Sequence, residues 1–168
     1  MRIAARPVEL AVISFVALSV GFAAGLWLAR QDGGVSGGAG AASRAPHPVG
    51  AEDHLELGTL ALQQGDLASA ERHFAQAVAL EPGSARARAD LGAVLMLQGR
   101  WDEARSELDR ARDADPQSPE AWFLTGMLRR DGFADTAGAR EAWTRFLELI
   151  PSESPQAETV RGWLADLR

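Results

Sequence analysis

The chain has 168 residues, 23 acidic and 17 basic, so its formal net charge at neutral pH is −6. It contains no cysteine, which excludes disulfides, a thiolate nucleophile, cysteine-bound zinc and CxxCH haem attachment within this chain. From residue 51 onward 13 Arg face 21 Asp and Glu, giving −8, which argues against binding to a phosphate backbone. The length fits one compact domain plus its ends, and nucleic acid is not an expected partner.

An apolar segment follows a short N-terminus, residues 1–9, which is expected to be cytoplasmic. Residues 10–29 are uncharged and mostly apolar, and as a helix they would span about 30 Å, the thickness of a bilayer's hydrocarbon core. A cleaved signal peptide is the alternative. Its apolar region would normally be about 7 to 15 residues long, and no clean A-x-A site precedes Arg30. The sequence therefore favours an uncleaved transmembrane anchor.

Charges on either side of this segment predict its orientation. Arg2, Arg6 and the terminal amine precede it, whereas Arg30 follows it directly. This bias places the N-terminus in the cytoplasm and the rest of the chain outside it. The expected location is a bacterial inner membrane, crossed once, with a periplasmic or extracytoplasmic C-terminal domain. A small-residue series could also pair two such helices into a homo-oligomer: Ala17, Gly21 and Gly25.

Residues 30–50 predict a flexible linker, because they hold six glycines and no apolar periodicity. Their root-mean-square span would be about 25 Å, so the folded part could move away from the membrane surface. The glycines do not form a phosphate-binding loop, since the pattern G-x-x-x-x-G-K-[ST] is absent.

Residues 51–153 contain a pattern that recurs after 34 residues. Each copy has Leu or Thr before Gly, then Ala, a large apolar residue, a further Ala or Phe, and a closing Pro. After Gly126 each later landmark lies one residue further along the chain than the 34-residue spacing predicts. The landmarks are Gly58, Ala70, Phe74, Ala77 and Pro82, then Gly92, Ala104, Leu108, Ala111 and Pro116, then Gly126, Ala139, Trp143, Phe146 and Pro151.

These landmarks resemble the tetratricopeptide repeat family, in which helix pairs stack into a right-handed α-solenoid. Alanine-rich helices also produce Ala and Leu at many spacings, but chance does not readily align three Gly and three Pro landmarks. The resemblance implies an all-α domain over residues 51–168, with repeats at 51–84, 85–118 and 119–153. Residues 154–168 predict a capping helix, because Ser154 suits its N-cap and apolar residues recur at helical spacing: Ala157, Val160, Leu164 and Leu167.

No enzyme signature is found. The three histidines, His47, His54 and His73, are not spaced as i, i+4 ligands and form no HExxH motif. The serines fall mainly in the apolar segment, turns and helix ends, where capping explains them. We therefore expect no catalytic residue, metal or cofactor.

The resemblance implies a concave groove, lined by the first helix of each repeat. A separate packing face is expected to hold Leu57, Leu91 and Trp122. Seven of the nine groove positions are apolar, which predicts a surface for an amphipathic helix or apolar peptide. The alternative is that these residues bury one another or pack on the C-terminal helix. The positions are Leu55, Thr59, Leu62, Ala89, Ala93, Met96, Phe123, Met127 and Arg130.

Two subfamilies can be compared with these residues. Repeat proteins that clamp a chaperone's C-terminal carboxylate use Lys and Asn where this chain has Leu55, Thr59, Ala89 and Ala93, so that subfamily does not fit. The last third resembles the end of membrane-anchored repeat proteins of bacterial cytochrome c maturation, which implies an adaptor or chaperone for apocytochrome c. The residues that carry this resemblance are Trp143, Phe146, Leu147, Pro151, Ser154, Ala157, Val160 and Leu164.

The sequence therefore predicts a membrane-anchored, non-enzymatic module that binds a peptide or helix. A self-associating structural scaffold of a membrane or envelope complex is the alternative. Partner specificity is expected in the third repeat, where the register slips by one residue.

Overall fold

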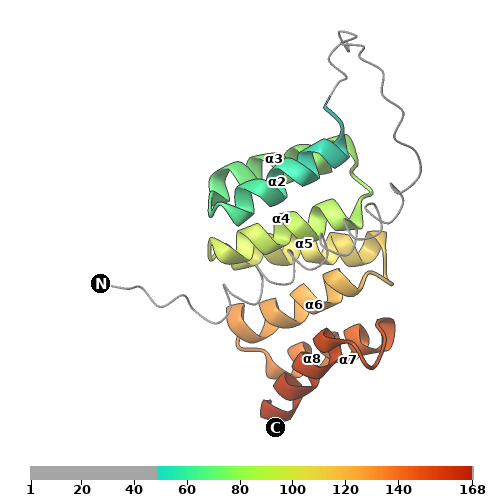
Figure 1. Cartoon of the computed structure of the whole chain (residues 1–168). Coiled ribbons are helices and arrows are strands. Elements are labelled where there is room, and N and C mark those ends of the chain that lie inside the picture. Colours follow the sequence, from blue (N-terminus) through green and yellow to red (C-terminus); the bar gives the residue numbers. More distant parts are fainter. Residues whose placement is uncertain (1–48, 168) are drawn as a thin grey trace, which may run out of the picture.

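A computed structural model describes residues 49–167, which form an all-helical stack (Figure 1). The helices are α2 (Ala51–Gln63), α3 (Leu67–Leu80), α4 (Ala85–Leu97), α5 (Trp101–Ala114), α6 (Pro119–Met127), a π-helical turn η1 (Leu128–Gly132), α7 (Thr136–Leu149) and α8 (Pro155–Asp166). Over these residues the predicted α-solenoid with a capping helix is confirmed. The predicted transmembrane anchor and most of the linker lie outside the described residues. None of the helices between residues 49 and 167 has the length and apolar character needed to cross a membrane.

Local sequence signals set the helix ends. A side-chain oxygen of Asp66, Ser84, Ser118, Asp135 or Ser154 accepts a hydrogen bond from the backbone N–H three residues later and caps α3, α4, α6, α7 or α8. The second helix of each pair ends two residues before Pro82, Pro116 or Pro151. Proline has no N–H to donate and disfavours helical geometry in the residue before it, so these positions end the helix as expected.

Two glycines make the turn inside the first two helix pairs. Gly65 and Gly99 have φ values of +77° and +74°, a left-handed conformation that glycine adopts without steric cost. The next backbone N–H, from Asp66 or Arg100, donates back to Ala61 or Leu95 at 2.9 Å and closes the helix end. The two turns are therefore built in the same way.

The repeating glycines allow the paired helices to approach each other closely. A Cβ placed on Gly58 would lie 2.6 Å from the Phe74 ring, and one on Gly92 would lie 2.9 Å from Leu108. Gly126 faces the Trp143 indole even more closely. These are the small and large landmarks of the sequence pattern, and the predicted pairing is thus present in all three repeats.

The one-residue slip in the third repeat coincides with the π-helical turn η1. A π-helix carries an extra residue per turn, so it widens the end of α6 without breaking it. Gly132 has no left-handed φ, unlike Gly65 and Gly99; instead it lies against Trp101 of α5, where a Cβ would come within 2.9 Å of the ring. Ala134 adopts the left-handed conformation in its place, with φ of +52°.

We expect Ala134→Gly to stabilise the domain by up to about 1 kcal/mol, because the left-handed conformation costs an L-amino acid roughly that much free energy and costs glycine almost none. Thermal unfolding followed by circular dichroism measures the effect. Ala137→Gly, in the first turn of the neighbouring α7, is the control and should destabilise. If both substitutions lower the unfolding temperature, Ala134 is not strained.

The predicted packing face is only partly buried. Leu91 and Trp122 are half-buried and pack on the core, but Leu57 is 42% exposed and Leu60 beside it is 50% exposed. The prediction for Leu57 is therefore wrong. Leu57 belongs to α2, at the end of the stack, so no preceding helix pair among the described residues covers it (Figure 1).

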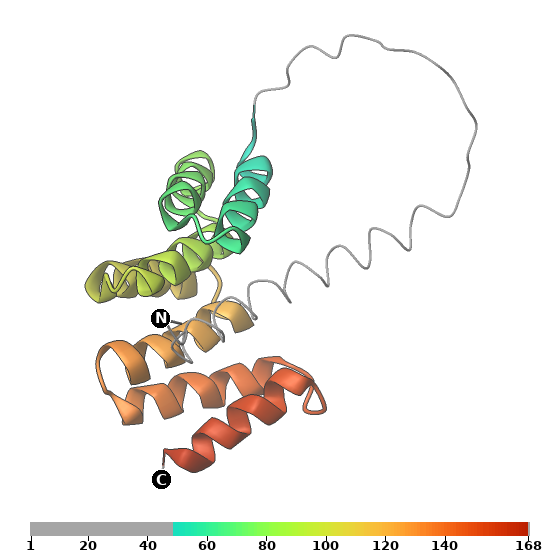
Figure 2. The ribbon, with the colours of Figure 1, turned by 60° about the vertical axis from the view of Figure 1, so that its left-hand side comes forward.

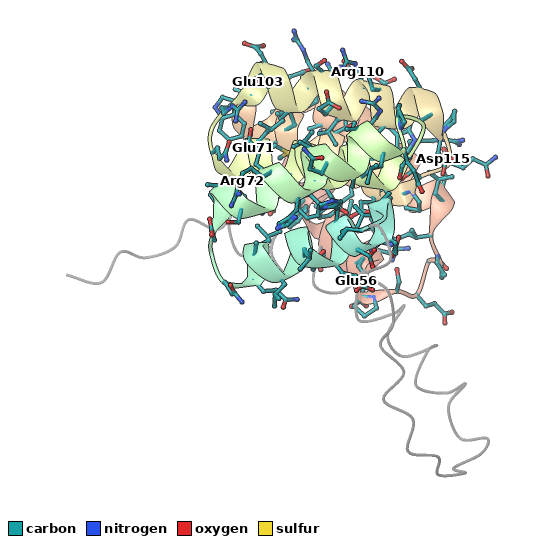
Figure 3. All side chains as sticks on the ribbon, turned by 90° about the horizontal axis from the view of Figure 1, so that it is seen from above. Glu56, Glu71, Arg72, Glu103, Arg110 and Asp115 are labelled. Carbon is teal, nitrogen blue, oxygen red and sulfur yellow. The ribbon has the colours of Figure 1, made fainter. Side chains whose placement is uncertain are left out.

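Charged side chains cover the outer surface of the stack (Figure 3). Arg100 joins the second helices of two repeats, since its Nη1 donates to Glu71 of α3 at 2.6 Å and its Nη2 to Glu103 of α5 at 2.6 Å. Hydrogen bonds from Gln98 and Arg100 lower the pKa of Glu71. Ion pairs this exposed contribute little to stability, so these contacts orient neighbouring repeats more than they hold them together.

Candidate functional site

The nine predicted groove residues lie on α2, α4, α6 and η1. Eight of them are buried, each with an exposed fraction of 5% or less: Leu55, Thr59, Leu62, Ala89, Ala93, Met96, Phe123 and Met127. Arg130 is the exception, with a side chain that is 25% exposed. The structure thus places Arg130 as the accessible polar member of the set.

Helices α6, α7 and α8 form the C-terminal end of the stack (Figure 2). Aromatic rings from all three helices gather there. The ring of Phe123 lies 5.3 Å from that of Phe146 and 5.8 Å from that of Trp163, measured between centroids. Trp143 and Trp163 are 5.1 Å apart. Tilted pairs at such separations are favourable beyond simple burial. Trp163 therefore joins α8 to both other helices.

Arg130 lies against this aromatic cluster. Its guanidinium carbon is 5.0 Å from the ring centroids of both Trp143 and Trp163, within the range of a cation–π interaction. Its Nε and Nη2 donate to the two carboxylate oxygens of Asp131 at 2.6 and 2.8 Å. Two indoles and one carboxylate thus fix the orientation of the guanidinium.

The π-helical turn sets this position. Arg130 is the third residue of η1, where the wider helical turn changes the direction of each side chain relative to an α-helix. Its Nη1 makes no hydrogen bond among residues 49–167 and remains available as a donor. The sequence placed Arg130 in the groove but gave no sign of the two indoles, because Trp163 lies 33 residues further along the chain.

The fold also brings His54 and His73 into contact, although they are 19 residues apart in the sequence. Nδ1 of His54 on α2 and Nδ1 of His73 on α3 are 3.1 Å apart, so one ring donates a hydrogen bond to the other. The part of the chain that the structure describes contains no group of three or more side chains that could hold a metal ion. The accessible polar group of the site is the guanidinium of Arg130, which lies beside the half-buried indole of Trp163.

A stack of helix pairs with such a face defines a class of protein, the α-solenoids, which act by presenting a surface to other molecules. Residues 61–128 match the family model described as tetratricopeptide repeat. This match runs from the end of α2 through α6, and it agrees with the resemblance to the tetratricopeptide repeat family that the sequence pattern indicated. None of the curated proteins matches the sequence.

Solved structures with the same fold have low sequence identity to this chain. The tetratricopeptide repeat domain of Arabidopsis OM64 is 18% identical, with a TM-score of 0.62 over 69% of this chain and 94% of its own. The first such domain of Spaghetti (RPAP3), bound to the HSP90 peptide SRMEEVD, is 17% identical, with a TM-score of 0.64 over 70% and 91%. The TPR2B domain of yeast Sti1, in complex with an Hsp70 peptide, is 19% identical, with a TM-score of 0.62 over 70% and 98%.

Proposed function

We propose that this chain is a non-enzymatic binding module whose partner, a peptide or a protein helix, contacts the face formed by α2, α4 and α6. The observation that carries the proposal is the guanidinium of Arg130, which the indoles of Trp143 and Trp163 and the carboxylate of Asp131 hold in place. A fixed donor beside the half-buried indole of Trp163 suits an apolar segment that also presents a carbonyl or carboxylate oxygen. The likeness to peptide-bound tetratricopeptide domains supports this proposal at the level of the fold.

The proposed partner differs from the peptide in the Spaghetti complex. That peptide, SRMEEVD, is acidic. This chain contains no lysine, and its predicted groove positions are mostly apolar. The folded part also carries a net charge of −8, which opposes the approach of acidic partners and favours basic ones. We therefore infer an apolar segment with basic flanks.

Arg130→Ala is expected to reduce recovery of the native partner at least tenfold when the full-length chain is purified from membranes. A tenfold loss corresponds to the roughly 1.4 kcal/mol of a charge-assisted hydrogen bond. Arg110→Ala is the matched control, because Arg110 pairs with Glu107 on the outer surface of α5 (Figure 3). Equal recovery with both variants, at unchanged helicity, rules out Arg130 as a partner contact.

The membrane anchor is a second part of the proposal. It rests on the uncharged residues 10–29 and on the basic residues before them. A chain anchored in this way stays in the membrane pellet after alkaline carbonate washing, and its domain is cleaved by protease added outside the inner membrane. Release by carbonate excludes the anchor, and protection of the domain excludes the extracytoplasmic orientation.

We further propose a role in cytochrome c maturation, as an adaptor that holds an apocytochrome segment. This role rests on the resemblance of residues Trp143 to Leu164 to the end of such proteins, and several of those residues belong to the hydrophobic core. Deleting the gene in its source bacterium should abolish covalently haem-stained c-type cytochromes. Unchanged haem staining would favour the alternative, a self-associating scaffold, which light scattering of the full chain in detergent detects as a stable oligomer.

A further inference from the structure

Three charged residues occupy the same place in successive repeats. Glu52, Arg86 and Glu120 are each the second residue of the first helix of a pair, on α2, α4 and α6. They are 34 residues apart, so the stacking of the repeats places them in a row. Asp90 adds a further carboxylate on α4, one helical turn beyond Arg86.

Arg86, the cation of this row, forms its hydrogen bond with Glu52, the most exposed of the three carboxylates. Arg86 Nη1 donates to Glu52 Oε1 at 3.0 Å, and the Glu52 side chain is 68% exposed. Arg86 Nε is 4.0 Å from Asp90 Oδ2, too far for a hydrogen bond, although the Asp90 side chain is only 5% exposed. Glu120 Oε1 is buried and has no hydrogen-bond partner among the residues that the structure describes. Two carboxyl groups thus lie in the joint between the second and third repeats without adequate compensation.

Burying an ionised carboxylate without a hydrogen-bond partner costs free energy, and such a group usually binds a proton instead. Burial raises the pKa of Asp90 well above its ordinary value, and the charge of Glu120 raises it further. Burial also raises the pKa of Glu120 to about 6, against the opposing effect of Arg86. The charged groups that act on the pair are Glu52 from α2 and Arg86 from α4.

We propose that Asp90 and Glu120 share a proton in the folded domain and that the joint between the second and third repeats is consequently controlled by pH. With the proton bound, the pair carries one negative charge instead of two. Loss of the proton leaves two like charges between α4 and α6 and weakens their contact. This inference is independent of the identity of the partner.

The dependence of folding stability on pH is opposite to that caused by a carboxylate in an ion pair, whose pKa is lowered by folding. Because the folded-state pKa lies above the unfolded one, the folded domain binds more protons than the unfolded chain between about pH 4 and pH 6. Stability contributed by the pair is therefore present at low pH and is lost as the pH rises through the folded pKa. Uptake of the proton tightens the stack.

The first test is thermal unfolding of the full-length chain in a mild detergent, followed by circular dichroism at about pH 5 and about pH 7.5. Glu120→Gln and Asp90→Asn should each raise the unfolding temperature at the higher pH, by roughly 3 to 6 °C, and change it little at the lower pH. Glu56→Gln is the control, since Glu56 is exposed on α2 (Figure 3). Variants that lower the unfolding temperature at the higher pH, or shift it equally at both, overturn the proposal.

A second test uses the neighbours of the pair and does not require Asp90 or Glu120 to be altered. Glu52→Gln frees Arg86 for the pair and removes a negative charge, so the midpoint of the pH transition should move to lower pH. Arg86→Gln removes the opposing cation, so the midpoint should move to higher pH. Movement in the same direction for both variants contradicts the shared proton.

Infrared spectroscopy observes the proton directly. At about pH 6 most of the exposed carboxyls are ionised, so the absorption of a protonated carboxyl should come mainly from the pair. It should disappear in the Asp90→Asn, Glu120→Gln double variant and persist in Glu56→Gln. A folded wild-type chain without this absorption at that pH contains no shared proton.

Discussion

Replacing Gly126 with alanine should destabilise the domain by about 3 kcal/mol and lower its unfolding temperature by roughly 10 °C. The added methyl group would overlap the indole of Trp143, which is fully buried and donates its Nε1–H to the Phe123 carbonyl at 3.2 Å. The ring has no free space to move into, so α6 and α7 must separate. Chemical denaturation of the full chain in detergent, followed by circular dichroism, measures this loss.

The chain supplies a matched control for this substitution. Gly162 lies inside α8, and an added Cβ would have no neighbour within 4 Å among the described residues outside its own stretch of helix, so Gly162→Ala should stabilise the helix by about 0.5 to 1 kcal/mol. Gly92→Ala should fall between the two, because its neighbour Leu108 can adjust its rotamer. If Gly126→Ala, Gly92→Ala and Gly162→Ala have similar stability, the close approach of the paired helices does not explain why glycine occupies the repeating position.

Trp143→Ala should cost about 3 to 5 kcal/mol, comparable with other large-to-small substitutions in fully packed cores. The loss should be concentrated in the third repeat and α8, because each repeat contacts only its neighbours. Hydrogen exchange should therefore show faster exchange in α6, α7 and α8 than in α2 and α3. Uniformly faster exchange along the stack would contradict a local effect.

Combining the two substitutions separates overlap from lost packing. With Trp143 already reduced to alanine, the methyl group added by Gly126→Ala meets empty space, so the double variant should be about as stable as Trp143→Ala alone. The expected coupling energy is about 2 kcal/mol or more, at the upper end for residues in contact. Additive effects would mean that Gly126 and Trp143 do not constrain each other.

Most of the fold follows from the sequence, because its signals are local and periodic. Capping residues, turn glycines and terminating prolines act within a few positions, and the landmark pairs are separated by nearly constant distances along the chain. The slip after Gly126 was visible in the sequence, but its form was not. An extra residue can be looped out or absorbed in a helix, and the structure shows it absorbed in the π-helical turn, where Gly132 packs against Trp101.

The candidate site was less predictable, because its contacts join residues far apart in the sequence. The position of Arg130 could be inferred from the repeat, but its contact with Trp163 depends on how α8 docks on α7. His54 and His73 illustrate the same limit, since they face each other only once α2 and α3 have paired. The burial of Glu120 Oε1 had no sequence signal beyond the 34-residue spacing of Glu120 from Arg86. Periodicity predicts which side of a helix a residue occupies, and tertiary docking decides what it meets.

The two ends of the stack are unlike, and this gives the domain a polarity. At one end α2 leaves Leu57 and Leu60 uncovered, whereas at the other α8 presents Glu158, Arg161 and Asp166 to solvent. A further helix pair added before α2 would find apolar side chains to cover, but one added after α8 would have to bury charge. The array can therefore be extended in one direction only, and gene duplication or partner docking that lengthens it would have to begin at α2.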